Sequence, residues 1–149
     1  MPDSGPPDVV LGFDFGMRRI GVAVGSGVSG SAQALTTLHH SGDGPDWAAV
    51  RRLVGEWRPQ ALVVGLPLLE SGEEQPITGH ARWFMRELGA QFNLPIHQAD
   101  ERFTSTEALA RLRTERASGA RRKRLSKGDT DAMAAQIILE TWLISHRDG

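Results

Sequence analysis

The chain has 149 residues, a length that suits one domain with a single hydrophobic core. Hydrophobic residues make up 40% and charged residues 23%, which are ordinary values for a globular protein. The lack of cysteine excludes disulfides and thiolate metal sites, and no apolar run approaches the roughly 20 residues of a membrane span. We therefore expect a cytoplasmic protein that does not enter a membrane, with residues 1–8 as a disordered lead and residues 9–149 as one domain.

The N-terminal part of the chain predicts three strands. Apolar residues alternate along residues 9–16, which places Asp14 on the face opposite its phenylalanine neighbours. A short turn leads into a second strand at residues 20–24, so this pair should form a hairpin. Residues 25–31 are rich in Gly and Ser and predict a loop, which precedes a third strand at residues 33–38.

Helices and strands alternate in the rest of the chain. In chain order we expect a helix at 46–57, a strand at 61–66, a helix at 76–92, a strand at 96–99, a helix at 104–115, a basic loop at 117–127 and a helix from about 128 to 145. The first helix has an apolar face that includes Trp57, and the strand at 61–66 is apolar throughout, as if covered on both faces. This alternation predicts an α/β fold with right-handed crossovers and parallel strands.

The net charge of −1 conceals an uneven distribution of basic residues. Residues 111–127 contain eight Lys or Arg side chains and one acid, so this segment carries about +7 and the remainder about −8. A solvated helix end and loop would explain such a run. Its position directly before an acidic motif favours a docking surface for a polyanion such as nucleic acid.

Three acidic motifs are the strongest functional signal. Asp14 in GFDFG and the Asp100-Glu101 pair in ADERFTS end predicted strands, and Asp131 lies in the opening turn of the last helix. Carboxylates at such positions cost free energy unless something offsets their charge. A pair of Mg²⁺ or Mn²⁺ ions would do so, because these ions prefer oxygen ligands. The sequence therefore predicts a metal-dependent enzyme that acts on phosphodiesters.

Side-chain spacing refines two of these positions. Asp131 falls on the apolar face of its helix, so it should face the edge of a sheet; Asp129 better suits the plainer role of an acid at a helix start. Asp100 and Glu101 are neighbours in an extended segment, so only one of them can readily face Asp14. The residues alone do not choose between the two.

Four stretches together resemble the YqgF/RuvX family of the ribonuclease H-like superfamily. They fall in order across about residues 8–145, and they are GFDFGMRRIGVAV, ALVVGLPL, ADERFTSTEA and KGDTDAMAAQIILETWL. The resemblance implies a ribonuclease H-like α/β fold, with a five-stranded mixed sheet whose first three strands are antiparallel, parallel additions, and flanking helices. It also implies catalytic metal ligands at Asp14, Glu101 and Asp131, with Asp100 and Asp129 as further candidates.

One departure from related junction resolvases bears on the choice within the acidic pair. In those proteins an acid ends the central parallel strand, whereas that strand here ends in Gly65-Leu66-Pro67. The second ligand should then come from the next strand, which favours Glu101.

The family resemblance implies a nuclease with a two-metal site, in which Asp14 bridges two Mg²⁺ or Mn²⁺ ions. Two functions compete, namely processing of the precursor of 16S ribosomal RNA and resolution of Holliday junctions in branched DNA. A resolvase should be a two-fold homodimer, whereas an RNA processor could act as a monomer. A non-catalytic nucleic-acid-binding module is a third interpretation, which three intact acidic positions argue against.

Basic side chains near these motifs are the expected contacts to nucleic acid, because phosphate contacts supply affinity without reading sequence. These candidates are Arg18, Arg19, Arg102, Arg121, Arg122, Lys123, Arg124 and Lys127.

Overall fold

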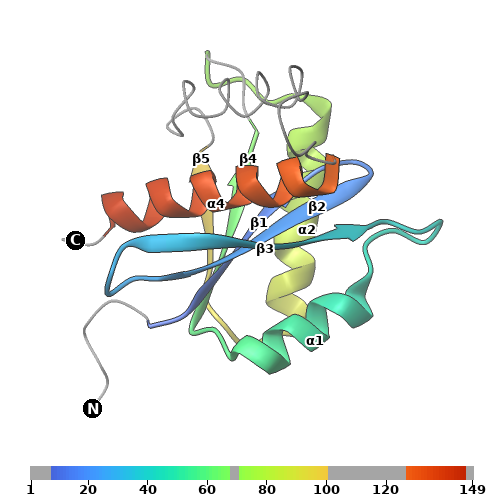
Figure 1. Cartoon of the computed structure of the whole chain (residues 1–149). Helices are drawn as coiled ribbons and strands as arrows, with labels where there is room; N and C mark the ends of the chain where they lie inside the picture. The colour runs from blue at the N-terminus through green and yellow to red at the C-terminus, as the bar shows by residue number, and fades with distance from the viewer. Residues whose placement is uncertain (1–7, 68–70, 101–126, 147–149) are drawn as a thin grey trace, which may run out of the picture.

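The computed structural model describes residues 8–67, 71–100 and 127–146, with the backbone alone at residues 127–129 (Figure 1). Its centre is a five-stranded mixed sheet in the order β3-β2-β1-β4-β5. β2 is antiparallel to β1 and β3, whereas β4 runs parallel to β1 and to β5. The strands are β1 (Val10–Phe15), β2 (Arg19–Ser26), β3 (Ser31–His39), β4 (Ala61–Leu66) and β5 (Ile96–Asp100). This sheet confirms the predicted antiparallel start and parallel additions.

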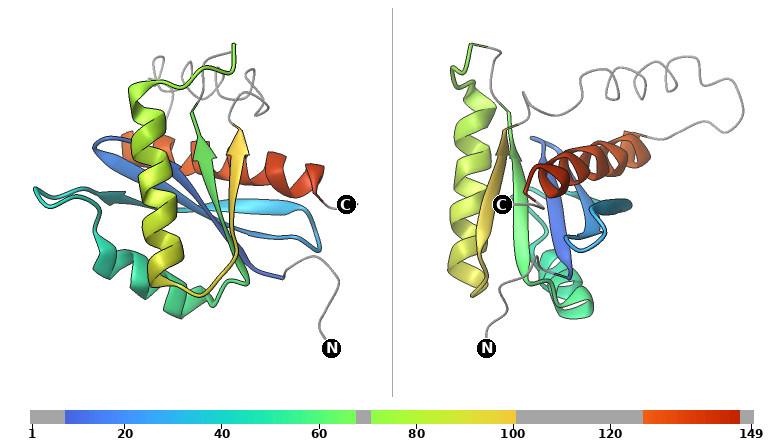
Figure 2. Two further views of the ribbon diagram at one scale, coloured as in Figure 1. Left: turned by 180° about the vertical axis from the view of Figure 1, so that it is seen from behind. Right: turned by 90° about the vertical axis from the view of Figure 1, so that its left-hand side faces the viewer.

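Helices cover both faces of the sheet. The helices α1 (Trp47–Trp57) and α2 (Pro76–Gln91) pack against one face, and α4 (Lys127–Ser145) packs against the other. Figure 2 (right) shows α2 in yellow-green and α4 in red on opposite sides of the sheet. None of these described helices is long and apolar enough to cross a membrane. The predicted helix at 104–115, most of the predicted basic loop and the lead at residues 1–7 lie outside the described residues.

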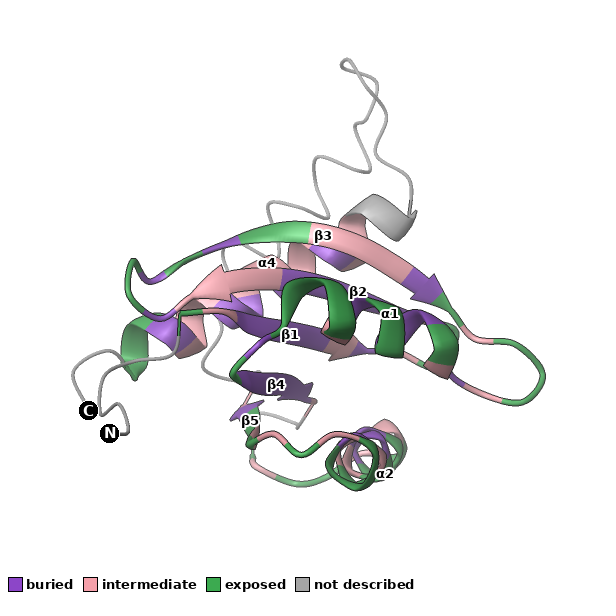
Figure 3. Cartoon of the chain, turned by 90° about the horizontal axis from the view of Figure 1, so that it is seen from below, coloured by how far each residue is buried: buried purple, intermediate pink, exposed green. Residues whose placement is uncertain are grey.

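The face toward α1 and α2 carries large apolar side chains. Phe13 and Phe15 of β1 meet Phe84 of α2, with ring centroids 5.6 and 5.3 Å apart. Burying one such side chain contributes about 1.5–3 kcal/mol, so this cluster holds both helices firmly. β4 is buried along its whole length, as its uniformly apolar sequence predicts (Figure 3). Apolar residues of α2 also lie in or against this core, namely Ile77, Ala81, Phe84, Met85 and Leu88.

The face toward α4 is built from small residues. Gly12 of β1 lies against Leu139, since a Cβ added there would approach the Leu139 side chain to 3.0 Å. Ala132 and Ala135 on α4 are also small and buried. Where glycine on the sheet meets alanine or backbone on the helix, α4 can approach the strands closely, and the carboxyl end of β1 comes near its first turns.

Three expected features differ in the structure. β2 begins at Arg19 and continues through Gly25 and Ser26, so the loop predicted at residues 25–31 is shorter. Gly25 can belong to the strand because its pairing with Ala32 uses backbone groups alone. The last helix begins one residue earlier than expected, because Lys127 belongs to α4 rather than to the basic loop. Trp57, expected on the apolar face of its helix, is 38% exposed, and it is the final residue of α1.

Candidate active site

Asp14 lies at the carboxyl end of β1, on the side of the sheet that faces α4. Its immediate neighbours Phe13 and Phe15 belong to the opposite hydrophobic cluster, and strand alternation turns Asp14 away from them. Its cross-strand partner is Gly21 of β2, and Asp14 itself is half-buried. Because β1, β4 and β5 run parallel, their carboxyl ends share this edge of the sheet.

Gly21 brings the start of α4 directly onto this position. A Cβ added at Gly21 would lie 2.5 Å from the carbonyl carbon of Asp131 and closer still to its oxygen. No other residue type permits that approach without a shift of the backbone. The first turns of α4 therefore rest on the strand position paired with Asp14, and Asp14 and Asp131 share one corner of the fold. The sequence placed both acids correctly on their elements but carried no signal for the role of Gly21.

Asp131 is paired with a cation from the same corner. Nε of Arg19 lies 2.5 Å from Oδ2 of Asp131, and the two side chains are 26% and 28% exposed. Arg19 is the first residue of β2 and shares the face of Gly21 by alternation. The guanidinium of Arg19 neutralises an acidic candidate in this structure, and the contact with nucleic acid that the sequence predicts for Arg19 stays a prediction. Arg18, its neighbour, is exposed.

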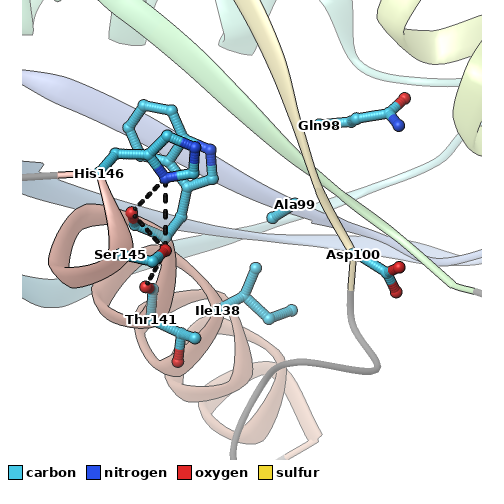
Figure 4. Close-up of a pocket in the computed structure, with 8 residues that line it drawn as sticks. Gln98, Ala99, Asp100, Ile138, Thr141, Ser145 and His146 are labelled. Carbon is cyan, nitrogen blue, oxygen red and sulfur yellow. Dashed lines mark hydrogen bonds between the residues drawn. The ribbon is translucent and has the colours of Figure 1, made fainter. Parts of the chain in front are cut away.

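Of the third acidic motif, the structure describes Asp100, the last residue of β5, but not Glu101. Ala99 faces α4, whereas Asp100 and Gln98 point the other way (Figure 4). Asp100 is therefore turned from the face that carries Asp14. Among the described residues, no group of three acidic or histidine side chains forms a ready metal cluster. Other candidates lie outside the residues or side chains described, namely Glu101, Arg102, Arg121, Arg122, Lys123, Arg124, Lys127 and Asp129.

A pocket of about 230 Å³ opens between β5 and α4, with Asp100 at its border (Figure 4). On α4 the indole of Trp142 stacks on His146 with centroids 4.3 Å apart, and it meets the ring of His97 from β5 at 5.0 Å. Although His97 is exposed, burial of part of its ring desolvates the imidazole and lowers its pKa below the usual 6.5. The nearby His146 lowers this pKa further. No sequence pattern predicts this aromatic group, because His97 lies on β5 whereas Trp142 and His146 lie in and just after α4.

The lowered pKa of His97 predicts a loss of stability in mild acid. As pH falls through about 6.5, the unfolded chain binds a proton at His97 before the folded chain does, so folding stability declines; above that pH both states are neutral. The midpoint temperature of thermal unfolding should therefore fall as the pH is lowered from 7.5 to 5.5. His97→Gln should flatten that decline, with His80→Gln at an exposed position of α2 as the matched control. An unchanged pH slope in His97→Gln would contradict this interpretation.

The architecture matches solved structures of one class. RuvC of T. thermophilus, solved in complex with a Holliday junction substrate, superposes with a TM-score of 0.56 at 16% identity, over 93% of this chain and 96% of that one. A second Thermus thermophilus RuvC structure gives a TM-score of 0.54 at 18% identity, with 93% and 97% coverage. At this identity the likeness concerns the fold alone, and it defines an α/β protein of the ribonuclease H-like class.

The sequence comparisons identify the family. Residues 8–145 match the family model described as RuvX, Holliday junction resolvase. A Xanthomonas campestris pv. campestris (strain 8004) protein named "Putative pre-16S rRNA nuclease" is 47% identical over 147 residues, which is 96% of this chain and 94% of the relative. A protein of the same name from Xanthomonas axonopodis pv. citri (strain 306) is 45% identical over 146 residues, with the same coverage. The chain belongs to the RuvX family, and it is a nuclease.

Proposed function

We propose that this nuclease depends on divalent metal ions and processes the precursor of 16S ribosomal RNA. The observation that carries this proposal is the corner where Gly21 brings the first turns of α4, and with them Asp131, onto the strand position paired with Asp14. The names of relatives 47% and 45% identical across nearly the whole chain support this RNA as the substrate. Action on ribosomal precursors would place the protein in the cytoplasm.

The proposed metal ligands are Asp14, Glu101 and Asp131. Carboxylate oxygens are the ligands that Mg²⁺ and Mn²⁺ favour, and Asp131 already holds a cationic group in the guanidinium of Arg19, so the site suits positive charge. Because Asp100 turns away from the face of Asp14, its neighbour Glu101 is the better candidate for the shared site. Asp100 and Asp129 remain secondary candidates. Two bound ions would supply a reactive hydroxide and stabilise the leaving oxygen.

The residues of the chain itself would position the substrate. Half-burial of Asp14 limits water around its carboxylate, which strengthens its interaction with any nearby cation. The basic run at residues 111–127 would bind phosphates near the cut without reading sequence. Arg18 is exposed beside the same corner and would add to this positive surface.

Resolution of Holliday junctions is the second candidate function. The description of the matching family model favours it. Resolution requires two symmetrically related cuts, so a resolvase should act as a two-fold homodimer, whereas RNA processing is possible for a monomer. The substrate and the oligomeric state therefore distinguish the two candidates together.

A cleavage assay tests the proposal with three substrates side by side. With Mn²⁺ present, we expect cleavage of a precursor 16S RNA fragment in preference to an unrelated single-stranded RNA and a four-way DNA junction. In the same assay Glu101→Gln should reduce the rate by about 100-fold or more, because a lost metal ligand costs several kcal/mol of transition-state stabilisation. Asp100→Asn, the matched neutral change beside it, should have a much smaller effect.

Each arm of this assay has a distinct contrary result. Symmetrical cutting of the junction with no RNA cleavage would favour the resolvase function. Loss of activity in Asp100→Asn with full activity in Glu101→Gln would reverse the ligand assignment within the pair. Equal cleavage with EDTA and with Mn²⁺ would rule out a metal-dependent reaction.

A further inference from the structure

The ion pair between Arg19 and Asp131 occupies the corner proposed for metal binding. Arg19 Nε contacts Asp131 Oδ2 at 2.5 Å, while Asp14 approaches the same corner from the strand position opposite Gly21. Two carboxylates near one another repel unless a positive charge lies between or beside them. In this structure the guanidinium of Arg19 supplies that charge to Asp131.

The pair is only partly buried. Arg19 is 26% exposed and Asp131 is 28% exposed, so water reaches both groups. The attraction between two opposite charges weakens where water reaches them. A divalent ion, with twice the charge and a preference for carboxylate oxygen, can therefore displace the guanidinium.

The backbones of both partners are fixed, which confines any exchange to the side chains. The carbonyl of Arg19 accepts a hydrogen bond from Gly16 N at 2.9 Å, and Arg19 pairs with His39 in the β2–β3 ladder. The backbone of Asp131 is fixed against Gly21. The carboxylate can therefore stay in place while the long guanidinium side chain swings into solvent.

We propose that Arg19 is an exchangeable counter-ion: it holds Asp131 in the metal-free protein and yields that carboxylate to the entering metal ion. This inference rests on the proposed metal-dependent function. Arg19 thereby competes with the metal for Asp131, so it sets how much free metal the protein needs before its site fills.

Mn²⁺ binding measured by electron paramagnetic resonance tests this competition without any cleavage reaction. Removing the competitor in Arg19→Ala should tighten Mn²⁺ binding about three- to fivefold, because an ion pair that water reaches is worth at most about 1 kcal/mol and 1.4 kcal/mol corresponds to tenfold in affinity. Arg18→Ala removes the same charge from an exposed neighbouring position, and it should change the affinity by less than about twofold because solvent and salt screen it. Arg19→Lys keeps the charge, loses the Nε contact, and should give an intermediate affinity.

Thermal unfolding provides a second measurement. In EDTA, Arg19→Ala should unfold at a lower temperature than the wild type, because Asp131 loses its counter-ion; at saturating Mn²⁺ this difference should shrink. If Arg19→Ala does not fold, the affinity of Arg19→Lys decides, since a value no tighter than that of the wild type contradicts competition.

The outcomes separate this inference from the proposed function. Equal affinities in Arg19→Ala and Arg18→Ala, or weaker binding in Arg19→Ala, would overturn the role of Arg19 as a competing counter-ion. If the wild type binds no Mn²⁺, or if Asp131→Asn binds it as well as the wild type, the metal site itself is wrong. The inference then falls together with the function on which it rests.

Discussion

Asp14→Asn should abolish cleavage while the fold persists. The change is nearly isosteric and removes one negative charge from the proposed site. Loss of a metal ligand would cost several kcal/mol of transition-state stabilisation, and each 1.4 kcal/mol corresponds to about tenfold in rate, so we expect a loss of about 1,000-fold. Initial rates of RNA cleavage at saturating Mg²⁺ would measure it.

The surroundings of Asp14 explain why the fold should survive. Its backbone pairs with Gly21 in the ladder, and its neighbours Phe13 and Phe15 remain buried in the opposite cluster, so the replacement leaves the sheet pairing and this core unchanged. Asp43→Asn, the same chemical change on an exposed loop, is the matched control and should cleave normally. Full activity of Asp14→Asn at saturating Mg²⁺ would refute the metal-dependent mechanism proposed here.

Gly21→Ala should reduce both stability and activity through the packing of α4. The new Cβ would collide with the backbone of Asp131, which cannot rotate away as a side chain could. The first turns of α4 must therefore move off β2, at a cost of about 1–3 kcal/mol for an overpacked contact. The same movement separates Asp131 from Asp14, so cleavage should fall further than stability alone explains. Urea unfolding and cleavage rates, measured on the same preparation, would show both effects.

Two other glycines calibrate this prediction. At Gly12 the nearest atoms to an added Cβ belong to the Leu139 side chain, the closest at 3.0 Å, which is a smaller overlap than the one with the Asp131 backbone at Gly21, so Gly12→Ala should be milder. Gly55 in α1 has open space around it, and Gly55→Ala should stabilise the helix by about 0.5–1 kcal/mol. A wild-type unfolding midpoint and a wild-type rate in Gly21→Ala would show that the contact with α4 does not set the geometry of the site.

Local pattern predicted the elements well because side-chain periodicity depends on neighbours in sequence. Alternation in β1 correctly placed Asp14 on the face opposite Phe13 and Phe15. The apolar run of β4 correctly indicated a strand covered on both sides. The loop prediction for Gly25 and Ser26, made from their residue types, was wrong. Hydrogen bonds between strands come from the backbone, and the side chain of Leu143 on α4 fills the space beside Gly25.

The sequence by itself therefore determined the class of fold, the face on which Asp14 lies and the family. Only the tertiary structure decided that Gly21 admits the backbone of Asp131 and that Arg19 neutralises its carboxylate. The physical reason is that each contact joins two residues more than 100 positions apart in the chain that touch each other in the folded protein. No periodicity encodes such a distance, because it is set by how closely α4 packs on the sheet.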